Sequence, residues 1–569
     1  MDSPASHASS AGNDQPLGKS AVLHILCPVP LSYCVSVPDS VCVRVRERAY
    51  RDVCAGKGAC AVRSADSGMQ AFIQSSLKMK AKNPWHRPII IFITVLFVIG
   101  IVSMVAIGVV QNKPLHQKYK YGIVLDAGSS HTSVYIYQWP AEKENNTGMV
   151  QQMDACNVPG VGISGYSTEP NRAGDSLKSC MDKARSIIPN HRHPETPVYL
   201  GATAGMRLLE MENAAASEKV LESVERVLQT YPFSYQGARI ISGQEEGAFG
   251  WITVNYLNES LRQASGTLGA LDLGGASTQI TFVSGQKQES PDNSIDFRLY
   301  GHDYHVYTHS FLCYGKDQVL KLSLANEIRP VHTKTETIVV EDPCFHPGYR
   351  INKNFQSVFN SPCVTGLSYP EKNFVHVGSG NGTKCHAAVR KVFNDSGCSY
   401  SICSFNGIFQ PRVEGQFGAF SAFFFVMDFL NLTTLSLDEA KEELGKYCAT
   451  PWKIIKQNHP NVKEKYLAEY CFSGTYILTL LEDGYKFTSH NWQDIKFIKK
   501  IGNSDAGWTL GYMLNLTNMI PAESPDTPPL PYGGYVTLMV LFAVMILLLG
   551  LLACKVFRRP TGSAQKEII

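Results

Sequence analysis

The sequence lacks a charge imbalance. Its 569 residues include 52 lysines and arginines against 49 aspartates and glutamates, which gives a formal net charge of +3. No stripe rich in lysine and arginine is present, and proteins that bind nucleic acids depend on one. The composition therefore argues against a nucleic-acid partner. Because 569 residues exceed what one hydrophobic core usually organises, we expect more than one domain.

Charge is missing altogether from two long apolar runs. Residues 89–110 and 535–554 contain no charged side chain, and each reaches the length of about 20 residues that a helix needs to cross a bilayer. A buried core helix is the alternative, but uncharged runs of this length at both ends of the chain favour membrane spans. The first run begins too far from Met1 for a cleaved signal peptide.

Lysine and arginine are absent from the twenty residues before the second run, whereas Lys555, Arg558 and Arg559 follow it. The positive-inside rule then places the C-terminus in the cytoplasm. Two spans put the N-terminus there as well, and leave the middle of the chain outside. The predicted order is a disordered cytoplasmic tail (1–88), a span (89–110), an extracellular part (111–534) that ends in a proline-rich stalk (about 521–534), a second span (535–554) and a cytoplasmic tail (555–569).

The predicted extracellular part has the features of a secreted domain. An even number of cysteines in an oxidising compartment favours five disulfides, whose pairing the sequence leaves open apart from a local Cys398–Cys403 loop. The five cysteines before residue 88 show no metal-binding spacing. The N-x-S/T acceptors are Asn145, Asn258, Asn381, Asn394, Asn431 and Asn515, and the cysteines are Cys156, Cys180, Cys313, Cys344, Cys363, Cys385, Cys398, Cys403, Cys448 and Cys471.

The same part alternates strand and helix patterns. Residues 197–209 read as strand, turn and helix, and residues 238–257 read as strand, loop and helix. Between them, residues 217–231 carry apolar side chains at the spacing of one helix face. The alternation predicts an α/β fold.

Two short segments share one layout. "DAGSSHT" (126–132) and "DLGGAST" (272–278) each place an aspartate after an apolar run, before small and hydroxyl side chains. Glycines let backbone N–H groups approach an anion, and hydroxyls donate hydrogen bonds to phosphate oxygens. Either segment alone is an ordinary glycine turn, but the matched pair favours phosphate binding between two related lobes. The residues concerned are Gly128, Ser129, Ser130, Thr132, Gly274, Gly275, Ser277 and Thr278.

We call residues 126–132 the first small-residue corner and residues 272–278 the second; each begins with a carboxylate. Asp126 and Asp272 would repel phosphate unless a divalent cation with its waters lies between them. A hydrolytic reaction also needs a base, and "GQEEGAFGW" offers Glu245 or Glu246 where a loop opens a helix. Both glutamates could equally be solvated loop residues. Thr203, in "GATAG", could reach phosphate or water, or could stabilise a structural turn.

The chain resembles the ecto-nucleoside triphosphate diphosphohydrolases, or apyrases, over about residues 89–560. All five signature regions of that family have counterparts, in the family's order. They are "DAGSSHT", "GATAGMRLL", "ISGQEEGAFGWITVN", "ALDLGGASTQI" and "SDAGWTLGYMLNLTN". The resemblance implies two RNase H-like lobes of the actin/Hsp70/hexokinase type, with the nucleotide bound in the cleft between them.

The resemblance also implies roles for particular residues. Glu246 would be the general base, and Ser277 and Gln279 would position the attacking water. Asp126 and Asp272 would hold Ca²⁺ or Mg²⁺ through waters, with Trp508 nearby. The phosphate-binding residues would be Gly128, Ser129, Ser130, His131, Thr132, Thr203, Gly274, Gly275, Ala276 and Ser277; the nucleobase would lie between Phe425 and Tyr466; the disulfides would join Cys156–Cys180, Cys313–Cys363, Cys344–Cys385, Cys398–Cys403 and Cys448–Cys471.

The implied activity is hydrolysis of extracellular ATP and ADP to the monophosphate at the plasma membrane, which would end purinergic signalling. Small residues in the first span permit oligomers through the transmembrane helices. The alternative is a catalytically weak nucleotide-binding or adhesion receptor, but no signature residue is lost. Two departures from the family are the long segment 1–88 and the short segment 255–272, which puts the local fold there in doubt.

Overall fold

The computed structural model describes residues 86–111, 118–263, 266–329, 338–364, 372–394, 396–524 and 528–557. Residues 1–85 of the tail expected at 1–88, residues 525–527 of the expected stalk and residues 558–569 of the expected C-terminal tail lie outside this set.

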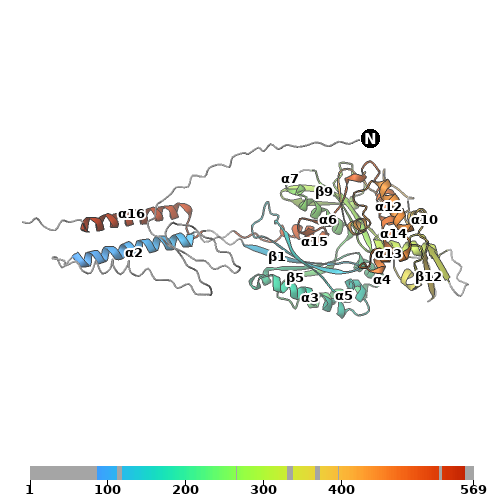
Figure 1. The fold of residues 1–569 in the computed structure, drawn as a ribbon, viewed down its shortest axis with the longest axis horizontal. Helices are drawn as coiled ribbons and strands as arrows, with labels where there is room; N and C mark the ends of the chain where they lie inside the picture. The colour runs from blue at the N-terminus through green and yellow to red at the C-terminus, as the bar shows by residue number, and fades with distance from the viewer. Residues whose placement is uncertain are drawn as a thin grey trace, which may run out of the picture. The chain divides into compact units, whose positions relative to one another are not determined.

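Two long helices contain the predicted spans. Helix α2 (His86–Gln111) and helix α16 (Tyr532–Phe557) carry apolar stretches with mean hydropathies of 3.1 and 2.9. Both are drawn in Figure 1, in blue and red. By length and composition each is long and apolar enough to cross a membrane. Exposed side chains such as Phe92 and Leu547 suit contact with lipid.

The first sheet has the strand order β3-β2-β1-β4-β5. Strands β1 and β2 form an antiparallel hairpin whose last pair is Ala127 with Thr132, so the first small-residue corner is the hairpin turn. On its other side β1 runs parallel to β4. The strands are β1 (Tyr119–Ala127), β2 (Thr132–Pro140), β3 (Gln151–Asn157), β4 (Pro197–Ala202) and β5 (Ser234–Ile240).

The second sheet repeats this arrangement, in the order β14-β13-β6-β7-β9-β8. Strands β6 and β7 form the antiparallel hairpin that carries the second corner, and β6 runs parallel to β13. The repeat found in two short segments therefore extends to both lobes. The strands are β6 (Gly269–Leu273), β7 (Ser277–Phe282), β8 (Ser294–Leu299), β9 (His302–Leu312), β13 (Phe417–Ser421) and β14 (Ile495–Phe497).

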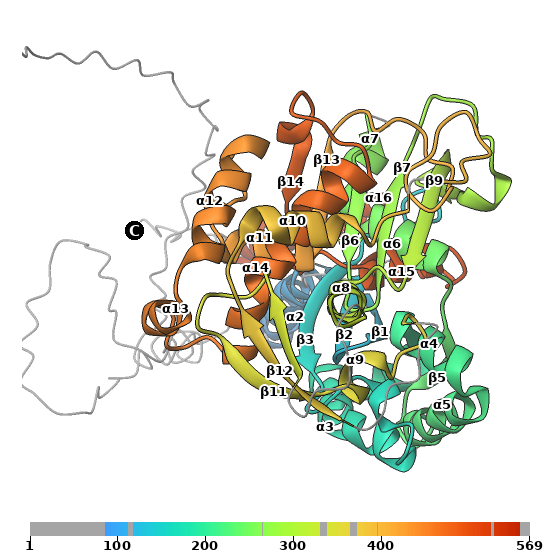
Figure 2. The same cartoon turned by 90° about the vertical axis from the view of Figure 1, so that its right-hand side faces the viewer.

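Helices cover both sheets and fill the space between them. Helices α3 (Asn171–Ile187) and α5 (Ala214–Leu228) pack on the first sheet, and a second group that includes α10 (Gly382–Arg390), α12 (Leu437–Ala449) and α14 (Glu464–Thr479) packs in the second lobe (Figure 2). Between the sheets lie α6 (Gly243–Leu257), against β6, β7 and β9, and α15 (Trp508–Thr517), against β1 and β2. Their apolar side chains form one core with residues of both sheets.

The crossing of α6 and α15 is very close. A Cβ added to Gly511 would lie 2.0 Å from the carbonyl oxygen of Phe249. The Thr253 hydroxyl joins the two helices, because it donates to the carbonyl oxygen of Gly507 at 2.6 Å and accepts from the N–H of Gly511 at 2.8 Å. This crossing connects the two lobes.

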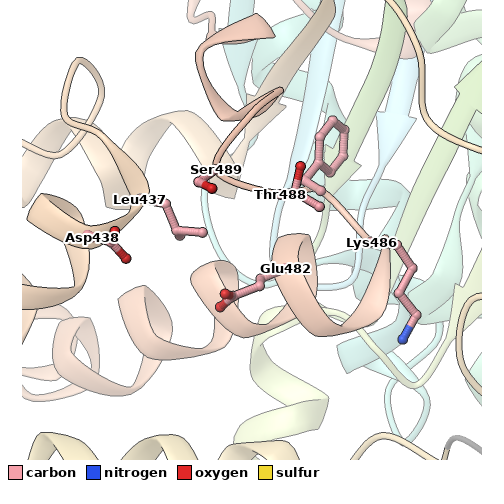
Figure 3. A pocket seen from close by; sticks show the side chains of 7 residues that line it. Leu437, Asp438, Glu482, Lys486, Thr488 and Ser489 are labelled. Carbon is pink, nitrogen blue, oxygen red and sulfur yellow. The ribbon is translucent and has the colours of Figure 1, made fainter.

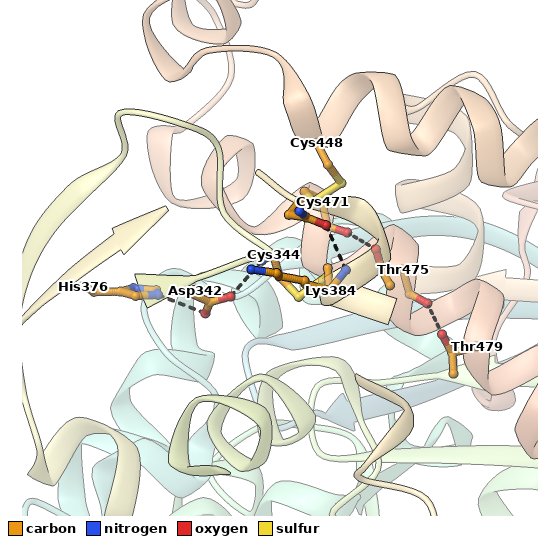
Figure 4. Close-up of a disulfide and its surroundings, with 10 residues drawn as sticks. Asp342, Cys344, His376, Lys384, Cys448, Cys471, Thr475 and Thr479 are labelled. Atoms are coloured by element: carbon orange, nitrogen blue, oxygen red, sulfur yellow. Dashed lines mark hydrogen bonds and ion pairs between the residues drawn. A yellow bond between two sulfur atoms is a disulfide. The ribbon is translucent and has the colours of Figure 1, made fainter. Parts of the chain in front are cut away.

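Five disulfides link helices, strands and loops, and two of them lie in the core of the second lobe. The bonded pairs are those that the resemblance implies: Cys156–Cys180, Cys313–Cys363, Cys344–Cys385, Cys398–Cys403 and Cys448–Cys471. Figure 4 shows Cys448–Cys471, which joins α12 to α14, with Thr475 donating to the carbonyl oxygen of Cys471 at 2.9 Å. Cys344–Cys385 joins α10 to the end of a smaller sheet in the order β10 (Ile338–Asp342), β12 (Asn373–Gly378), β11 (Arg350–Asn354).

The short segment 255–272 keeps a regular fold where it is described. The buried side chain of Asn255 donates to the carbonyl oxygen of Leu268 at 2.8 Å and accepts from its N–H at 2.7 Å. These two bonds tie the end of α6 to the start of β6, across the short helix α7 (Ser260–Gln263). The segment is shorter than its counterpart in the family, yet helix α6 and strand β6 on either side of it are intact.

Five of the six predicted glycosylation acceptors are exposed, namely Asn145, Asn258, Asn381, Asn394 and Asn431. Asn515 differs because it lies within α15 and is half-buried, and the hydroxyl of Thr517 in its acceptor sequence is fully buried. That hydroxyl accepts from the N–H of Gly148 at 2.8 Å.

Gly511→Ala should destabilise the protein by about 3 kcal/mol, because its new methyl group meets a backbone carbonyl that cannot move independently of α6. Thermal unfolding of the purified full chain in detergent measures the effect. Gly445→Ala in α12 is the matched control, since its Cβ would meet nothing within 4 Å and should leave stability unchanged or raise it. Equal melting temperatures for the two variants would contradict the close crossing.

Candidate active site

The two small-residue corners lie against each other. A Cβ added to Gly275, in the second corner, would lie 2.6 Å from the hydroxyl oxygen of Ser129, in the first. Gly162 lies behind the first corner, and a Cβ added to it would lie 2.4 Å from the carbonyl oxygen of Gly128. Gly315 lies behind the second corner, and a Cβ added to it would lie 2.3 Å from the backbone nitrogen of Ala276. These approaches require glycine, and they bring both corners to one place.

The corners present backbone N–H groups to this place. Helix α8 (Lys316–Ile328) begins beneath the second corner, and the N–H groups of Lys316 and Asp317 donate to the carbonyl oxygens of Gly274 and Gly275, both at 2.9 Å. Within the described part of the chain, the N–H groups of Ser129, Ser130, Gly275 and Ala276 donate to no other residue. Free N–H groups in consecutive small residues are typical of anion-binding turns.

Three carboxylates converge beside the corners. Burial, and then the neighbouring charges of Glu246 and Asp272, raise the pKa of Asp126, at the end of β1, to about 8. Burial, and then the charge of Glu246, raises the pKa of Asp272 to about 7. One oxygen of Asp126, Oδ1, is buried and has no partner among the described residues. Two buried carboxylates with an unsatisfied oxygen suit a hard divalent cation.

Trp508 closes one side of this cluster. It is the first residue of α15, is buried, and packs the edge of its indole ring against Gly201 of β4, where a Cβ would be 2.3 Å from that edge. Its indole N–H is near enough to lower the pKa of Asp126, although the two groups do not reach hydrogen-bond geometry. The structure thus places Trp508 beside the first aspartate.

The structure distinguishes the two glutamates that the sequence left open. Glu245 forms the capping box of α6 with Ser242 and pairs with Arg239, so it faces away from the carboxylate cluster. Glu246, one residue later, is buried and pairs with Arg207 of helix α4 (Ala204–Glu212). Burial raises the pKa of Glu246, and the Arg207 guanidinium opposes that rise.

Glu246 belongs to a hydrogen-bonded group with the two polar residues predicted on β7. Ser277 and Gln279 are alternate residues of the strand, so their side chains share one face. The Gln279 amide nitrogen lies 2.8 Å from the Ser277 hydroxyl, 2.9 Å from the Ser310 hydroxyl and 3.2 Å from Oε2 of Glu246. All three residues predicted to be catalytic therefore lie together.

Two members of this group were not predicted. Arg207 lies within the quoted segment "GATAGMRLL", where a lone cation in an apolar helix pattern is the signal that could have found it. Ser310 comes from near the end of β9 (His302–Leu312) and is brought to Gln279 by strand pairing. Nothing in its local sequence indicates that contact.

The remaining predicted phosphate-binding residues line the first corner. The N–H of Thr203, at the end of β4, donates to the carbonyl oxygen of Ala127 at 3.1 Å. His131 is exposed, with Nδ1 3.0 Å from the Ser130 hydroxyl. Thr132 is fully buried and its hydroxyl has no partner among the described residues.

The predicted nucleobase residues are exposed aromatics on neighbouring helices. Phe425 of α11 (Ala422–Phe429) is 54% exposed and Tyr466 of α14 is 45% exposed. The Lys499 ammonium lies 5.7 Å from the centre of the Phe425 ring. Their exposure leaves both rings free to stack on a ligand.

The second lobe also has a surface pocket of about 370 Å³ (Figure 3), which contains none of the predicted site residues. Glu482 lines it and lies with His386 and Asp483 in a cluster of a type that can hold a metal ion. Lys441 pairs with Glu482 at 2.7 Å and Arg390 with Asp483 at 3.6 Å, so these acids already have cationic partners. The pocket's lining residues are Leu437, Asp438, Glu482, Lys486, Phe487, Thr488 and Ser489.

Two repeated lobes with paired corners and a carboxylate cluster define an α/β protein of the actin/Hsp70/hexokinase type. The chain belongs to the GDA1/CD39 (nucleoside phosphatase) family, whose model matches residues 112–528.

Relatives and a solved structure agree with this assignment. The chain is 49% identical over 503 residues to ectonucleoside triphosphate diphosphohydrolase 1 of Mus musculus, which covers 85% of this chain and 97% of the relative. It is 51% identical over 487 residues to the Bos taurus protein of the same name, with coverages of 82% and 94%. A crystal structure of nucleoside triphosphate hydrolases from Neospora caninum shares the fold, with a TM-score of 0.54 at 15% identity over 78% of this chain and 99% of that one.

Without divalent cations, the protein should lose stability as the pH rises. Asp126 and Asp272 have pKa values of about 8 and about 7 when folded, above the ordinary value of 3.8, so the folded state holds protons that the unfolded state has released. Stability then falls as the pH rises from the unfolded value toward these folded values, and the melting temperature in EDTA should drop between about pH 4 and 8. Asp126→Asn should weaken this dependence, whereas Asp175→Asn, at an exposed position of α3, should not. The same dependence of melting temperature on pH in both variants would contradict the raised pKa of Asp126.

Proposed function

We propose that the chain is an ecto-nucleotidase that hydrolyses ATP and ADP to AMP and inorganic phosphate. The observation that carries the proposal is the hydrogen-bonded group of Glu246, Gln279 and Ser277 beside two facing anion-binding corners. The curated relatives named ectonucleoside triphosphate diphosphohydrolase support the substrate class.

Glu246 acts as the general base in this proposal. Both of its protein partners, Arg207 and Gln279, contact Oε2, so Oε1 is the oxygen left to accept a proton. Burial raises the pKa of Glu246, and the Arg207 guanidinium opposes that rise and so favours the ionised form that a base requires. The carboxylate removes one proton from a water molecule as that water attacks.

Gln279 and Ser277 orient the water. The amide oxygen of Gln279 is buried and has no partner among the described residues, so it is free to accept a hydrogen bond from water. The Ser277 oxygen accepts from Gln279, which leaves the serine proton to donate to a phosphate oxygen. Water then attacks the terminal phosphorus in line, and the bond to the bridging oxygen breaks as the new P–O bond forms.

Asp126 and Asp272 would hold Ca²⁺ or Mg²⁺ through water molecules, with Trp508 packed alongside. The donor types and the unsatisfied Oδ1 of Asp126 fit this role. The bound cation would supply charge neutralisation to the phosphate chain and the leaving group. The N–H groups of the two corners would bind the phosphate oxygens directly.

The wider setting follows from the same family. Phe425 and Tyr466 would stack on the nucleobase, and α2 and α16 would cross the plasma membrane with both termini in the cytoplasm. The catalytic cleft would then lie outside the cell, where hydrolysis ends purinergic signalling. Association between transmembrane helices would allow oligomers to form.

Glu246→Gln should lower kcat for ATP by about 10³-fold, because the amide cannot take a proton from water. Phosphate release from membranes that display equal amounts of each variant measures this. Glu245→Gln is the matched control, since Glu245 caps α6 and pairs with Arg239. Full activity in Glu246→Gln would contradict the role of Glu246 as the general base.

Membranes that carry the chain should release phosphate from ATP and ADP but not from AMP, and EDTA should abolish the release. In water enriched in oxygen-18, the label should appear in inorganic phosphate and not in AMP, because water attacks the terminal phosphorus. Label in AMP would mean attack at the α-phosphorus. Nucleotide binding without phosphate release would favour the receptor alternative.

A further inference from the structure

Ser310 of β9 lies directly opposite Gln279 of β7. The two strands are antiparallel, and their register pairs these two residues. Directly paired residues present their side chains on the same face of a sheet, and the Ser310 hydroxyl oxygen lies 2.9 Å from the Gln279 amide nitrogen. The pairing of two sheet strands, rather than a loop, therefore fixes this contact.

The start of α6 confines the Ser310 side chain from the other side. A Cβ added to Gly243, the first residue of α6, would lie 2.3 Å from the Cβ of Ser310 and 2.4 Å from its hydroxyl oxygen. The same Cβ would lie 2.6 Å from Nη1 of Arg207, whose Nη2 pairs with Glu246. Glycine at this position thus leaves room for the serine hydroxyl between β9 and the helix that carries the base.

The Gln279 amide nitrogen has more acceptors within reach than it has protons. It carries two protons, and it lies 2.8 Å from the Ser277 hydroxyl, 2.9 Å from the Ser310 hydroxyl and 3.2 Å from Oε2 of Glu246. An ionised carboxylate can only accept, so the nitrogen and not the amide oxygen faces Glu246. The amide oxygen is buried and has no partner among the described residues.

We propose that Ser310 is a positioning residue that holds the Gln279 amide with its oxygen toward the attacking water. Ser310 accepts one amide proton and Ser277 accepts the other, so the amide is fixed at its nitrogen end. Without Ser310, the second proton turns toward Oε2 of Glu246, and the amide oxygen moves away from the water. This inference rests on the water-orienting role given to Gln279 under the proposed function.

Ser310→Ala should lower kcat for ATP about tenfold, because a misdirected water slows the chemical step. The KM for ATP should stay unchanged, since Ser310 belongs to neither of the corners proposed to bind phosphate. Phosphate release, measured per molecule of chain displayed on the membrane, gives both constants. The melting temperature of the purified full chain in detergent checks that the variant is folded at the assay temperature.

A double-mutant cycle separates positioning from a general loss of structure. If Ser310 acts through Gln279, its removal should have no further effect once Gln279 has been replaced. Gln279→Ala and the double variant Gln279→Ala/Ser310→Ala should therefore have the same kcat. If Ser310 only stabilised the sheet, its removal would lower kcat by the same factor in both backgrounds, and that result would overturn the inference.

Thr308→Val is the matched control. Thr308 lies two residues before Ser310 on the same face of β9, and the partners of its buried hydroxyl are the Thr281 hydroxyl at 2.8 Å and the carbonyl oxygen of Gln244 at 3.4 Å. This variant should lower the melting temperature and leave kcat unchanged. A wild-type kcat in Ser310→Ala would overturn the inference while the proposed function stands, and a wild-type chain that releases no phosphate would overturn both.

Discussion

Three buried carboxylates that approach one another are the constraint on which the rest of this structure depends. Asp126, Glu246 and Asp272 come from a strand of each lobe and from the helix between them, and burial raises the pKa of each. Arg207 is the cation paired with one of them. Such a cluster persists only if the scaffold holds it, because separation of the lobes would relieve the repulsion. The close crossing of α6 and α15 supplies that restraint.

The repeated lobe determines where each kind of chemistry lies. Each hairpin turn carries small residues because the opposite corner and a backing loop approach within contact distance of the backbone. Each leading aspartate lies at or near the carboxyl end of the central strand, beside a parallel neighbour whose end contributes further polar groups. Helix α6 lies between the sheets, so the glutamate in its first turn reaches both corners. Two copies of one hairpin and one shared helix are thus enough to build the cleft.

Much of this was predictable from the sequence, because the corners are local patterns and the repeat implies paired lobes. The choice between Glu245 and Glu246 has a local signal, because Ser242 and Glu245 have the S-x-x-E spacing of a capping box, which ties Glu245 to the start of α6. Ser310 reaches Gln279 through strand pairing, a contact for which its local sequence has no signal. The disulfide pairs followed from resemblance to a family, because spacing alone leaves their connectivity open.

Both connections toward the predicted spans leave from the first lobe. Lys120, at the start of β1, pairs with Glu523 at 2.9 Å, and Arg192 contacts the same carboxylate at 3.5 Å. Strand β1 runs from this ion-pair group to Asp126 and the first corner in nine residues. Asp126 is thus joined to this group along a single strand, whereas Asp272 is joined to it through the contact between the two corners and through the α6–α15 crossing.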